Sequence, residues 1–157
     1  MLHLVLVHPE IPHNTGAAGR LAVATGSRLH LVRPLGFSLD EKHLRRTGLD
    51  YWQYVDLRLW DSLEEVEAAA EPGAHFWYLS TKAKQGIWAP ELPLRDGDYF
   101  VFGPESKGLP ESLLAAHPER GLRIPMPGEH ARSLNLSTSV AIMLYEAMRR
   151  INGAAGA

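Results

Sequence analysis

The sequence predicts an α/β domain in which helices cover both faces of a mostly parallel β-sheet. Short apolar segments alternate with helical segments along the whole chain. Several of the apolar segments show no polar alternation, which is typical of strands buried on both faces, as they are in a parallel sheet. Because the chain has 157 residues and neither a repeat nor a linker, we expect one domain spanning residues 1–157.

Six segments are expected to be strands because they are short, apolar and bounded by turn-forming residues. The first is rich in Val and Leu and ends before Pro9. The third alternates only weakly and is the least regular. The expected strands span residues 2–7, 29–32, 54–59, 76–79, 99–102 and 122–124.

Five segments are expected to be helices, and capping residues place their ends. Asn14 or Thr15 is expected to cap the first helix, which Gly26 ends. Asp61, with Glu64 three residues later, has the pattern of a capping box for the third helix. Apolar residues recur on one stripe of the last helix. The expected helices span residues 16–26, 40–46, 61–70, 110–116 and 134–151.

The composition excludes several kinds of site and favours the cytoplasm. The chain has no cysteine, which excludes disulfides, thiolate metal ligands and a cysteine nucleophile and suits a reducing compartment. The apolar run near the amino terminus is short and lacks a basic leader, so we expect neither a signal peptide nor a membrane span. The formal net charge is −2, so charge alone argues against tight binding of nucleic acid, although basic residues gather within residues 28–46.

Common ligand-binding fingerprints are absent from the sequence. The turn after the first expected strand contains G-x-x-G but not G-x-G-x-x-G, and Arg33 stands where a dinucleotide fold would carry an acidic residue. Neither a Walker A sequence nor the G-x-S-x-G elbow of hydrolases is present. His3, His8 and His13 do not have the spacing of a helical zinc site, so we expect no metal.

Four segments that follow expected strands have an unusual content of glycine and polar residues. In open α/β sheets, ligands bind beyond the carboxyl ends of the strands. We therefore expect these segments to form the functional site. They are residues 9–20, 79–86, 102–110 and 124–137.

Motifs within these segments resemble those of the SPOUT superfamily of RNA methyltransferases. Within it, the chain is similar to the small tRNA (cytidine/uridine) 2′-O-methyltransferase group, which acts at the wobble position of the anticodon. Asn14, Gly16 and Arg20 match the first motif, N-x-G-x-x-x-R. Gly19 is a small departure, since a larger residue would be unremarkable there. The other matching segments are residues 29–37, 44–51, 102–110 and 124–146.

The resemblance implies a fold, a cofactor and a reaction. It implies a C-terminal trefoil knot whose loops bind S-adenosyl-L-methionine (SAM), and an active site at the interface of a homodimer. The reaction implied is methyl transfer to the ribose 2′-hydroxyl of the wobble nucleotide of tRNA. Glu105 has a second interpretation, in which it holds a network of amides together across the loops. The implied cofactor contacts are Leu79, Ser80, Thr81, Gly103, Pro104, Glu105, Ile124, Met126, Ser133, Leu134 and Asn135.

Arg20 is the expected catalytic residue, and Asn14 its expected companion. In the family that the chain resembles, the motif arginine is linked to activation of the ribose hydroxyl. A guanidinium hardly ever loses its proton, so Arg20 is expected to bind the adjacent phosphate and stabilise alkoxide charge instead of acting as a base. Asn14 either orients the hydroxyl or caps its helix. The sequence favours neither interpretation over the other.

Polar and basic residues outside the cofactor contacts are expected to bind the tRNA substrate. Ser137 and Tyr145 are expected on the methyl-acceptor side, although Tyr145 could equally belong to the core. The first expected strand begins at residue 2, so we expect no RNA-binding domain before it. One alternative is methylation of another tRNA site or of ribosomal RNA, and another is a non-catalytic RNA-binding dimer. The expected phosphate contacts are Arg28, Lys42, Arg45, Arg46, Lys82 and Lys84.

Overall fold

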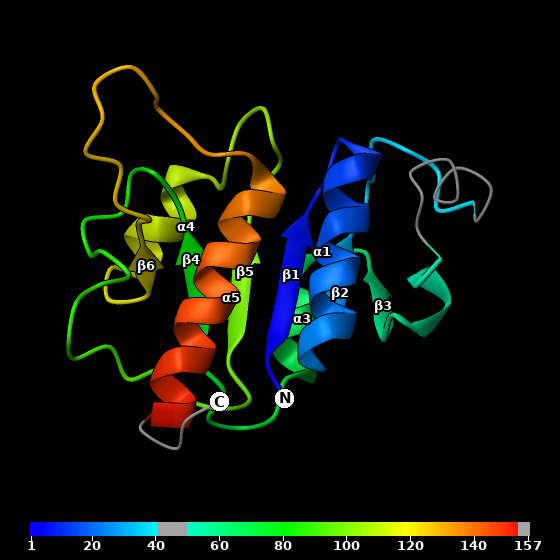
Figure 1. Cartoon of the computed structure of the whole chain (residues 1–157), viewed down its shortest axis with the longest axis horizontal. Helices are drawn as coiled ribbons and strands as arrows, with labels where there is room; N and C mark the ends of the chain where they lie inside the picture. Colours follow the sequence, from blue (N-terminus) through cyan, green and yellow to red (C-terminus); the bar gives the residue numbers. More distant parts are fainter. Residues whose placement is uncertain (41–49, 154–157) are drawn as a thin grey trace.

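The computed structural model describes residues 1–40 and 50–153 and contains one sheet of six strands (Figure 1). Every neighbouring pair of strands is parallel, and the spatial order is β3-β2-β1-β5-β4-β6. The expectation of a mostly parallel sheet is confirmed. The strands are β1 (His3–Val7), β2 (Arg28–Val32), β3 (Leu57–Trp60), β4 (Phe76–Leu79), β5 (Tyr99–Phe102) and β6 (Gly121–Leu122).

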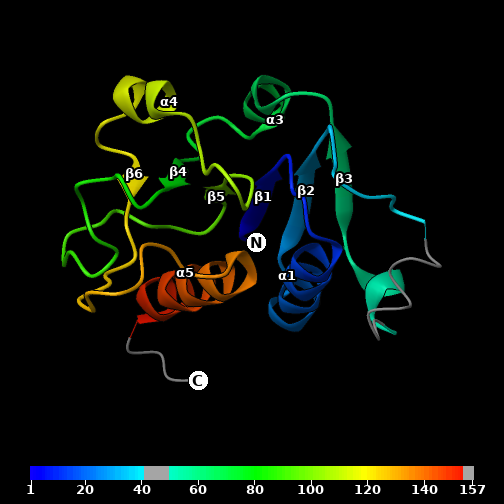
Figure 2. The same cartoon turned by 90° about the horizontal axis from the view of Figure 1, so that it is seen from above.

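Helices cover both faces of the sheet, as the apolar strands require. Figure 2 shows α1 and α5 together on one face and α3 and α4 on the other. The helix expected over residues 40–46 lies almost wholly outside the described residues. The described helices are α1 (Pro12–Thr25), α3 (Leu63–Ala69), α4 (Glu111–Ala116) and α5 (Leu136–Asn152), with a 3₁₀ turn η1 (Trp52–Tyr54).

The chain adds strands to opposite sides of β1 in its two halves, so the topology switches between β1 and β5. The first half of the chain adds β2 and β3 on one side of β1, whereas β5, β4 and β6 lie on the other side. Since all strands are parallel, their carboxyl ends share one edge. The crevice at such a switch is where open α/β sheets bind ligands.

Alternate residues of the central strands pack against the two helical layers. Leu4 and Leu6 of β1 belong to the cluster that includes residues of α1 and α5. Val5 and Val7 belong to a second cluster, which contains Val66 of α3. All four strand residues are buried. Burial on both faces explains why β1 shows no polar alternation.

A pair of histidines, the buried His30 and the half-buried His3, lies in the layer on the α3 side. The indole Nε1–H of Trp60 donates to His30 Nδ1 at 3.0 Å, so neutral His30 carries its proton on Nε2, which donates to His3 Nδ1 at 2.9 Å. Burial lowers the pKa of His30 to about 3 and that of His3 to about 4. Both rings are therefore neutral at pH 7, and they belong to the packing of the domain.

The starts of two helices differ from the sequence expectation. Helix α1 begins at Pro12, with Ile11 at the N-cap position, so the expectation that Asn14 or Thr15 caps it is wrong. Proline suits the first turn because that turn does not use its backbone N–H. The expected end at Gly26 is confirmed, since Gly26 adopts the left-handed conformation with φ 68°. Helix α5 begins at Leu136, with Asn135 as its cap, instead of at residue 134.

The capping box of α3 is present but shifted by one residue. Ser62 is the N-cap, and its Oγ accepts from Glu65 N at 3.2 Å. The Glu65 carboxylate accepts in return from the backbone N–H of Asp61 at 3.1 Å. The expected pair, Asp61 with Glu64, was wrong because both neighbouring pairs have the same spacing and Ser62 takes the extended backbone of a cap.

The third strand begins later than the sequence predicts. Residues 52–54 form η1, and the strand starts only at Leu57. This turn packs against Gly19 of α1, where a Cβ atom would lie 2.6 Å from Trp52 Cζ3. The expectation that a larger residue would be unremarkable at position 19 is therefore wrong.

Candidate functional site

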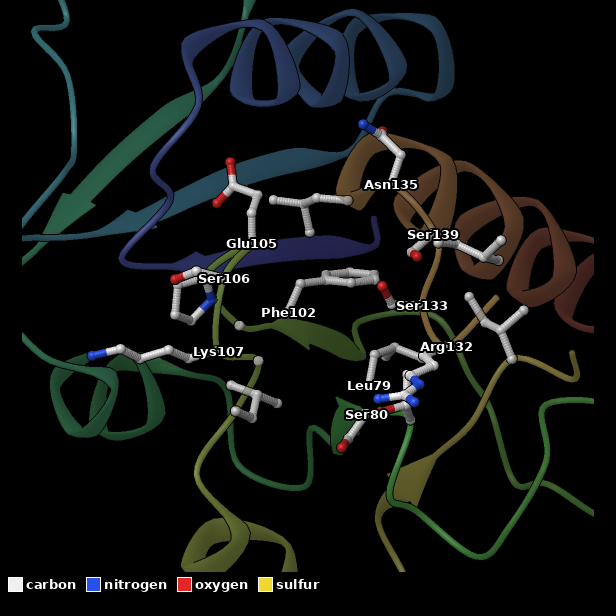
Figure 3. A pocket seen from close by; sticks show the side chains of 18 of the residues that line it. Leu79, Ser80, Phe102, Glu105, Ser106, Lys107, Arg132, Ser133, Asn135 and Ser139 are labelled. Carbon is white, nitrogen blue, oxygen red and sulfur yellow. The ribbon is translucent and has the colours of Figure 1, made fainter. Parts of the chain in front are cut away.

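A cavity of about 510 Å³ opens at the carboxyl edge of the sheet, beyond β4 and β5 (Figure 3). It is lined by residues from each of the four segments that follow β1, β4, β5 and β6. Segments more than a hundred residues apart in sequence meet here because the strand order places their strands close together. All the expected cofactor contacts line the cavity, namely Leu79, Ser80, Thr81, Gly103, Pro104, Glu105, Ile124, Met126, Ser133, Leu134 and Asn135.

Glu105 joins the loop after β5 to the start of α1. Its Oε1 accepts from the backbone N–H of Glu10 at 2.8 Å, and its Oε2 accepts from the N–H of Ile11 at 2.7 Å. Asn14 Nδ2 donates to the same Oε2 at 3.2 Å. A carboxylate is favoured here because amide donors and the positive end of the helix dipole face it. The structure thus shows the amide network that one interpretation of Glu105 requires.

Asn14 extends this network to the last helix. Its Oδ1 accepts from Asn135 Nδ2 at 3.1 Å. Asn135 in turn caps α5, because its Oδ1 accepts from the backbone N–H of Thr138 at 3.2 Å. Asn14 is 5% exposed and ties α1, the loop after β5 and α5 together. The capping interpretation of Asn14 is wrong, and its role in orienting the hydroxyl stays a prediction.

A second carboxylate, that of Glu10, holds the same two loops from the opposite direction. Ser106 donates to Glu10 Oε1 from both its backbone N–H and its Oγ, each at 2.7 Å. These hydrogen bonds lower the pKa of Glu10. Each of the two carboxylates, Glu10 and Glu105, therefore accepts hydrogen bonds from backbone N–H groups of the other loop. These bonds fix the loop after β5 relative to α1.

Gly103 lets the wall of the cavity fold back on itself. A Cβ atom at this position would lie 2.3 Å from the backbone carbon of Gly108 and 2.3 Å from the nitrogen of Leu109. No side chain fits at such distances, and neither neighbour can move as a side chain could. The close approach of two backbones at residues 103 and 108 gives the loop its shape and leaves the adjacent space open.

Arg20 lies apart from the cavity of its own chain. It is exposed on α1 and is absent from the lining of the cavity. It follows Asn14 by six positions, which places it about 9 Å further along the helix axis. Its guanidinium lies 5.6 Å from the centre of the Tyr51 ring. Within one chain, the structure therefore does not bring Arg20 and the expected cofactor contacts together.

The comparisons with known proteins identify the family. The model of the SpoU rRNA Methylase family matches residues 1–145. This chain belongs to the SpoU family. The tRNA (cytidine(34)-2′-O)-methyltransferase of Methylovorus glucosotrophus is 46% identical over 151 residues, which cover 96% of each of the two chains.

Solved structures of SpoU-type proteins share the fold. A structure that concerns the 2′-OH methylation of C/U34 on tRNA has a TM-score of 0.87 and 51% sequence identity, and the match covers 96% of this chain and 95% of that one. An rRNA methyltransferase from Sinorhizobium meliloti with bound AdoMet has a TM-score of 0.78 at 22% identity, and the match covers 95% of this chain and 56% of that one. The second likeness shows the fold alone.

Several side chains at the SpoU cavity were not singled out from the sequence. Arg132 and Lys107 add positive charge to the lining, and Ser139 comes from the first turns of α5 (Figure 3). Arg132 lies within the matched segment 124–146, so the motif contained the signal. Lys107 lies within the segment 102–110. Their side chains carried no pattern of their own in sequence, because an arginine or lysine in a loop is usually solvated.

The expected substrate contacts occupy different parts of the molecule. Lys82 lines the cavity and pairs with Glu111. Lys84 is exposed two residues later in the same loop. Arg28 begins β2, at the opposite edge of the sheet from the cavity, and donates to Asp56 Oδ2 at 2.9 Å. The geometry gives Arg28 no link to the site. Lys42, Arg45 and Arg46 lie outside the described residues.

Two further expectations concern α5. Ser137 Oγ donates to Asn135 Oδ1 at 2.6 Å and so sits beside the cap of the helix. Tyr145 is 51% exposed, which contradicts the alternative that it belongs to the core. Both roles on the acceptor side stay predictions.

The described part of the chain offers neither a metal centre nor a membrane span. Among residues 1–40 and 50–153, no three His, Asp or Glu side chains are grouped so that they could hold an ion. No helix within these ranges combines the length and the apolarity needed to cross a bilayer.

Proposed function

We propose that this protein transfers a methyl group from SAM to the ribose 2′-hydroxyl of the wobble nucleotide of tRNA. The observation that carries the proposal is the convergence of the four loops that follow β1, β4, β5 and β6 on one cavity beside the buried Asn14. The near-complete overlap with a tRNA (cytidine(34)-2′-O)-methyltransferase at 46% identity supports the choice of nucleotide. Its cytoplasmic location would follow from that substrate.

The cavity suits SAM in size and in chemistry. Its volume of about 510 Å³ lies within the usual range for cofactor sites. Leu79, Ile124 and Met126 offer apolar surface, whereas the turns at Gly103 and Ser133 bring backbone groups close to the space. When bound, SAM supplies an electrophilic methyl group on a sulfonium. The residues that we expect to hold it are the cofactor contacts already named.

Arg20 would act on the substrate side of the reaction. A guanidinium carries a positive charge and donates hydrogen bonds in a fork that fits a phosphate. We infer that it binds the phosphate next to the target ribose and stabilises the negative charge that develops on the 2′-oxygen. A phosphate oxygen or a water molecule would then accept the proton, because the guanidinium cannot.

We propose that the active unit is a homodimer, in which Arg20 of one chain approaches the cavity of its partner. The separation of Arg20 from its own cavity supports this arrangement. The outer surfaces of α1 and α5, which lie on one face of the sheet (Figure 2), also expose apolar side chains. Val23 on α1 and Ile142 and Tyr145 on α5 are 37%, 36% and 51% exposed. Sedimentation equilibrium is expected to give twice the mass of one chain.

We further propose that the C-terminal part of the chain is a trefoil knot. Residues 80–98 connect β4 to β5 and pair with the chain that leaves β6, since Arg123 N donates to Gln85 O at 2.8 Å and Ile87 N donates to Arg123 O at 3.0 Å. Arg150 of α5 also donates to Ile87 O at 2.9 Å. The contacts of this connection with both the chain after β6 and α5 support threading. A crystal structure whose Cα path straightens when both ends are pulled would contradict it.

The test of the function measures methyl transfer and its position. Purified protein with labelled SAM and a pool of tRNA is expected to incorporate label, and mass spectrometry of digested tRNA should locate it on nucleotide 34. Arg20→Ala is expected to abolish transfer but keep SAM binding, measured by calorimetry. Arg58→Ala, an exposed arginine on β3 paired with Asp56, serves as the matched control and should keep full activity.

Two results would contradict the proposal. Label on another ribose would move the activity to a different RNA site, and no incorporation with any tRNA would favour a binding protein. Loss of SAM binding in Arg20→Ala would show that Arg20 supports the cofactor instead of the substrate.

A further inference from the structure

The turn η1 is docked on α1 through a contact that fills the space left by the missing side chain of Gly19. The ring of Trp52 occupies the place of the missing side chain, with Cζ3 at 2.6 Å and Cε3 at 3.0 Å from where a Cβ atom would be. Val55 Cγ2 would lie at 3.3 Å from the same point. The packing fixes where residues 51–55 lie along the helix. It places them beside the turn of α1 that carries Arg20.

Tyr51 immediately precedes the docked turn and contacts α1 at two levels. Its hydroxyl donates to the carbonyl oxygen of Gly16 at 3.4 Å, one turn before Arg20. Its ring lies under the Arg20 guanidinium, 5.6 Å from the ring centre to Cζ. Burial raises the pKa of the Tyr51 hydroxyl. The aromatic ring thus gives an exposed arginine a fixed neighbour.

A fixed neighbour matters for a residue that must meet a phosphate in one orientation. An unrestrained arginine has many rotamers and loses that freedom when it binds. A ring face attracts the guanidinium and leaves its N–H groups free to point outward in the plane of the group. An arginine held in this way meets the substrate with part of the ordering already done.

We propose that Tyr51 is the positioning residue for Arg20, on a platform that exists because residue 19 is glycine. The inference rests on the proposed function, in which Arg20 contacts the substrate. Tyr51 itself is not assigned a contact with tRNA or with SAM. It acts through the orientation of the guanidinium.

The experiment compares three variants of neighbouring tyrosines under steady-state conditions. Tyr51→Leu removes the ring and is expected to lower kcat about tenfold, the size of one well-placed cation–π contact in the transition state. Tyr51→Phe keeps the ring and should retain more than half of the activity. Tyr54→Leu is the matched control, because Tyr54 is the last residue of η1, the turn that Tyr51 precedes, and is 71% exposed. It should leave kcat unchanged.

Two further measurements separate positioning from a merely structural effect. SAM affinity of Tyr51→Leu should equal that of the unaltered protein, since the cavity is untouched, and Tm should fall by no more than about 5 °C, the cost of the lost hydrogen bond to Gly16. The NMR resonance of Arg20 Nε–H, identified by its loss in Arg20→Ala, should move in Tyr51→Leu as the ring current disappears, and should stay in place in Tyr54→Leu.

Each outcome decides a different point. An unchanged kcat in a folded Tyr51→Leu protein, with Arg20→Ala inactive, would overturn the positioning role and leave the proposed function standing. A fall in Tm and SAM affinity together with kcat would also overturn it, because it would show general support of the fold. If the unaltered protein transfers no methyl group to tRNA, the proposed function fails and this inference fails with it.

Discussion

The two ends of α1 are attached to the rest of the protein in different ways. At its start, carboxylates bind backbone N–H groups, and Asn14 links Glu105 to Asn135. In its second half, the contact is between Gly19 and the Trp52 ring, with Tyr51 beside it. The first attachment is made of directional hydrogen bonds and close backbones, and the second of side chains that can tilt. The cavity is thus held rigidly by hydrogen bonds and close backbones, whereas Arg20 is positioned by side-chain packing, which yields more easily to a substitution.

Gly103→Ala should have the largest effect, because the new Cβ would meet backbone atoms that cannot move aside. We expect a loss of about 3 kcal/mol in the free energy of unfolding, from overpacking, together with loss of SAM binding. Urea unfolding and calorimetry measure the two effects. Gly128→Ala in the neighbouring loop is the control, since a Cβ there has no neighbour within 4 Å. Equal behaviour of the two variants would refute the rigid description of the cavity.

Glu105→Gln should have the next largest effect, because an amide NH₂ would face backbone donors. We expect a loss of about 2 kcal/mol, the range of hydrogen bonds to a charged group, and weaker SAM binding. Glu111→Gln removes an exposed carboxylate that pairs with Lys82 at the surface, and it should cost little. If urea unfolding gives the same small loss for both variants, the network at the start of α1 does not hold the loops.

Acid should lower the free energy of unfolding through His3 and His30, which belong to neither attachment of α1. The pKa values of His30 and His3 are lowered by burial to about 3 and about 4, so the folded state takes up fewer protons than the unfolded state below pH 6.5. Their stabilisation is present above that pH and falls as the pH drops toward 4. For His30 we expect a loss of about 2 kcal/mol between pH 7 and pH 5.

Urea unfolding at pH 7, 6 and 5 measures this slope. His13→Asn is the control, because His13 is exposed on α1 and its removal should leave the slope as it is. The lowered pKa of Glu10 predicts that its bonds to Ser106 persist at pH 5. If the free energy of unfolding does not change between pH 7 and pH 5, the His3–His30 pair is protonated in the folded state without cost.

Gly19→Ala should have the smallest effect on stability and a selective effect on catalysis. The Trp52 ring can tilt, and alanine favours the helix, so we expect a net loss of about 1 kcal/mol. Displacement of η1 should lower kcat while SAM affinity stays the same. In a Trp52→Leu background the same change should cost less, because the ring that the new Cβ would meet is absent. A variant that loses SAM binding would show that the second attachment also supports the cavity.

Much of the fold was predictable because it depends on neighbours within a few residues. The spans of β4 and β5 and the end of α1 at Gly26 agree with the sequence expectation. Errors fell at the starts of α1, α3 and α5, where several residues could cap and only the backbone decides. For the site, the motifs predicted which loops meet, since parallel strands place their carboxyl ends at one edge. They did not predict that Asn14 is held between Glu105 and Asn135.

The sequence by itself determined the alternation of strands and helices, the four loops at the cavity and the membership in a methyltransferase family. The tertiary structure alone decided which polar groups pair, because the partners of Glu105 are more than ninety residues away in the chain. It also decided that the Trp52 ring packs against Gly19 and that Arg20 stands apart from its own cavity. Local patterns carry information over one or two turns, whereas such contacts depend on strand order and on how helices pack across the sheet.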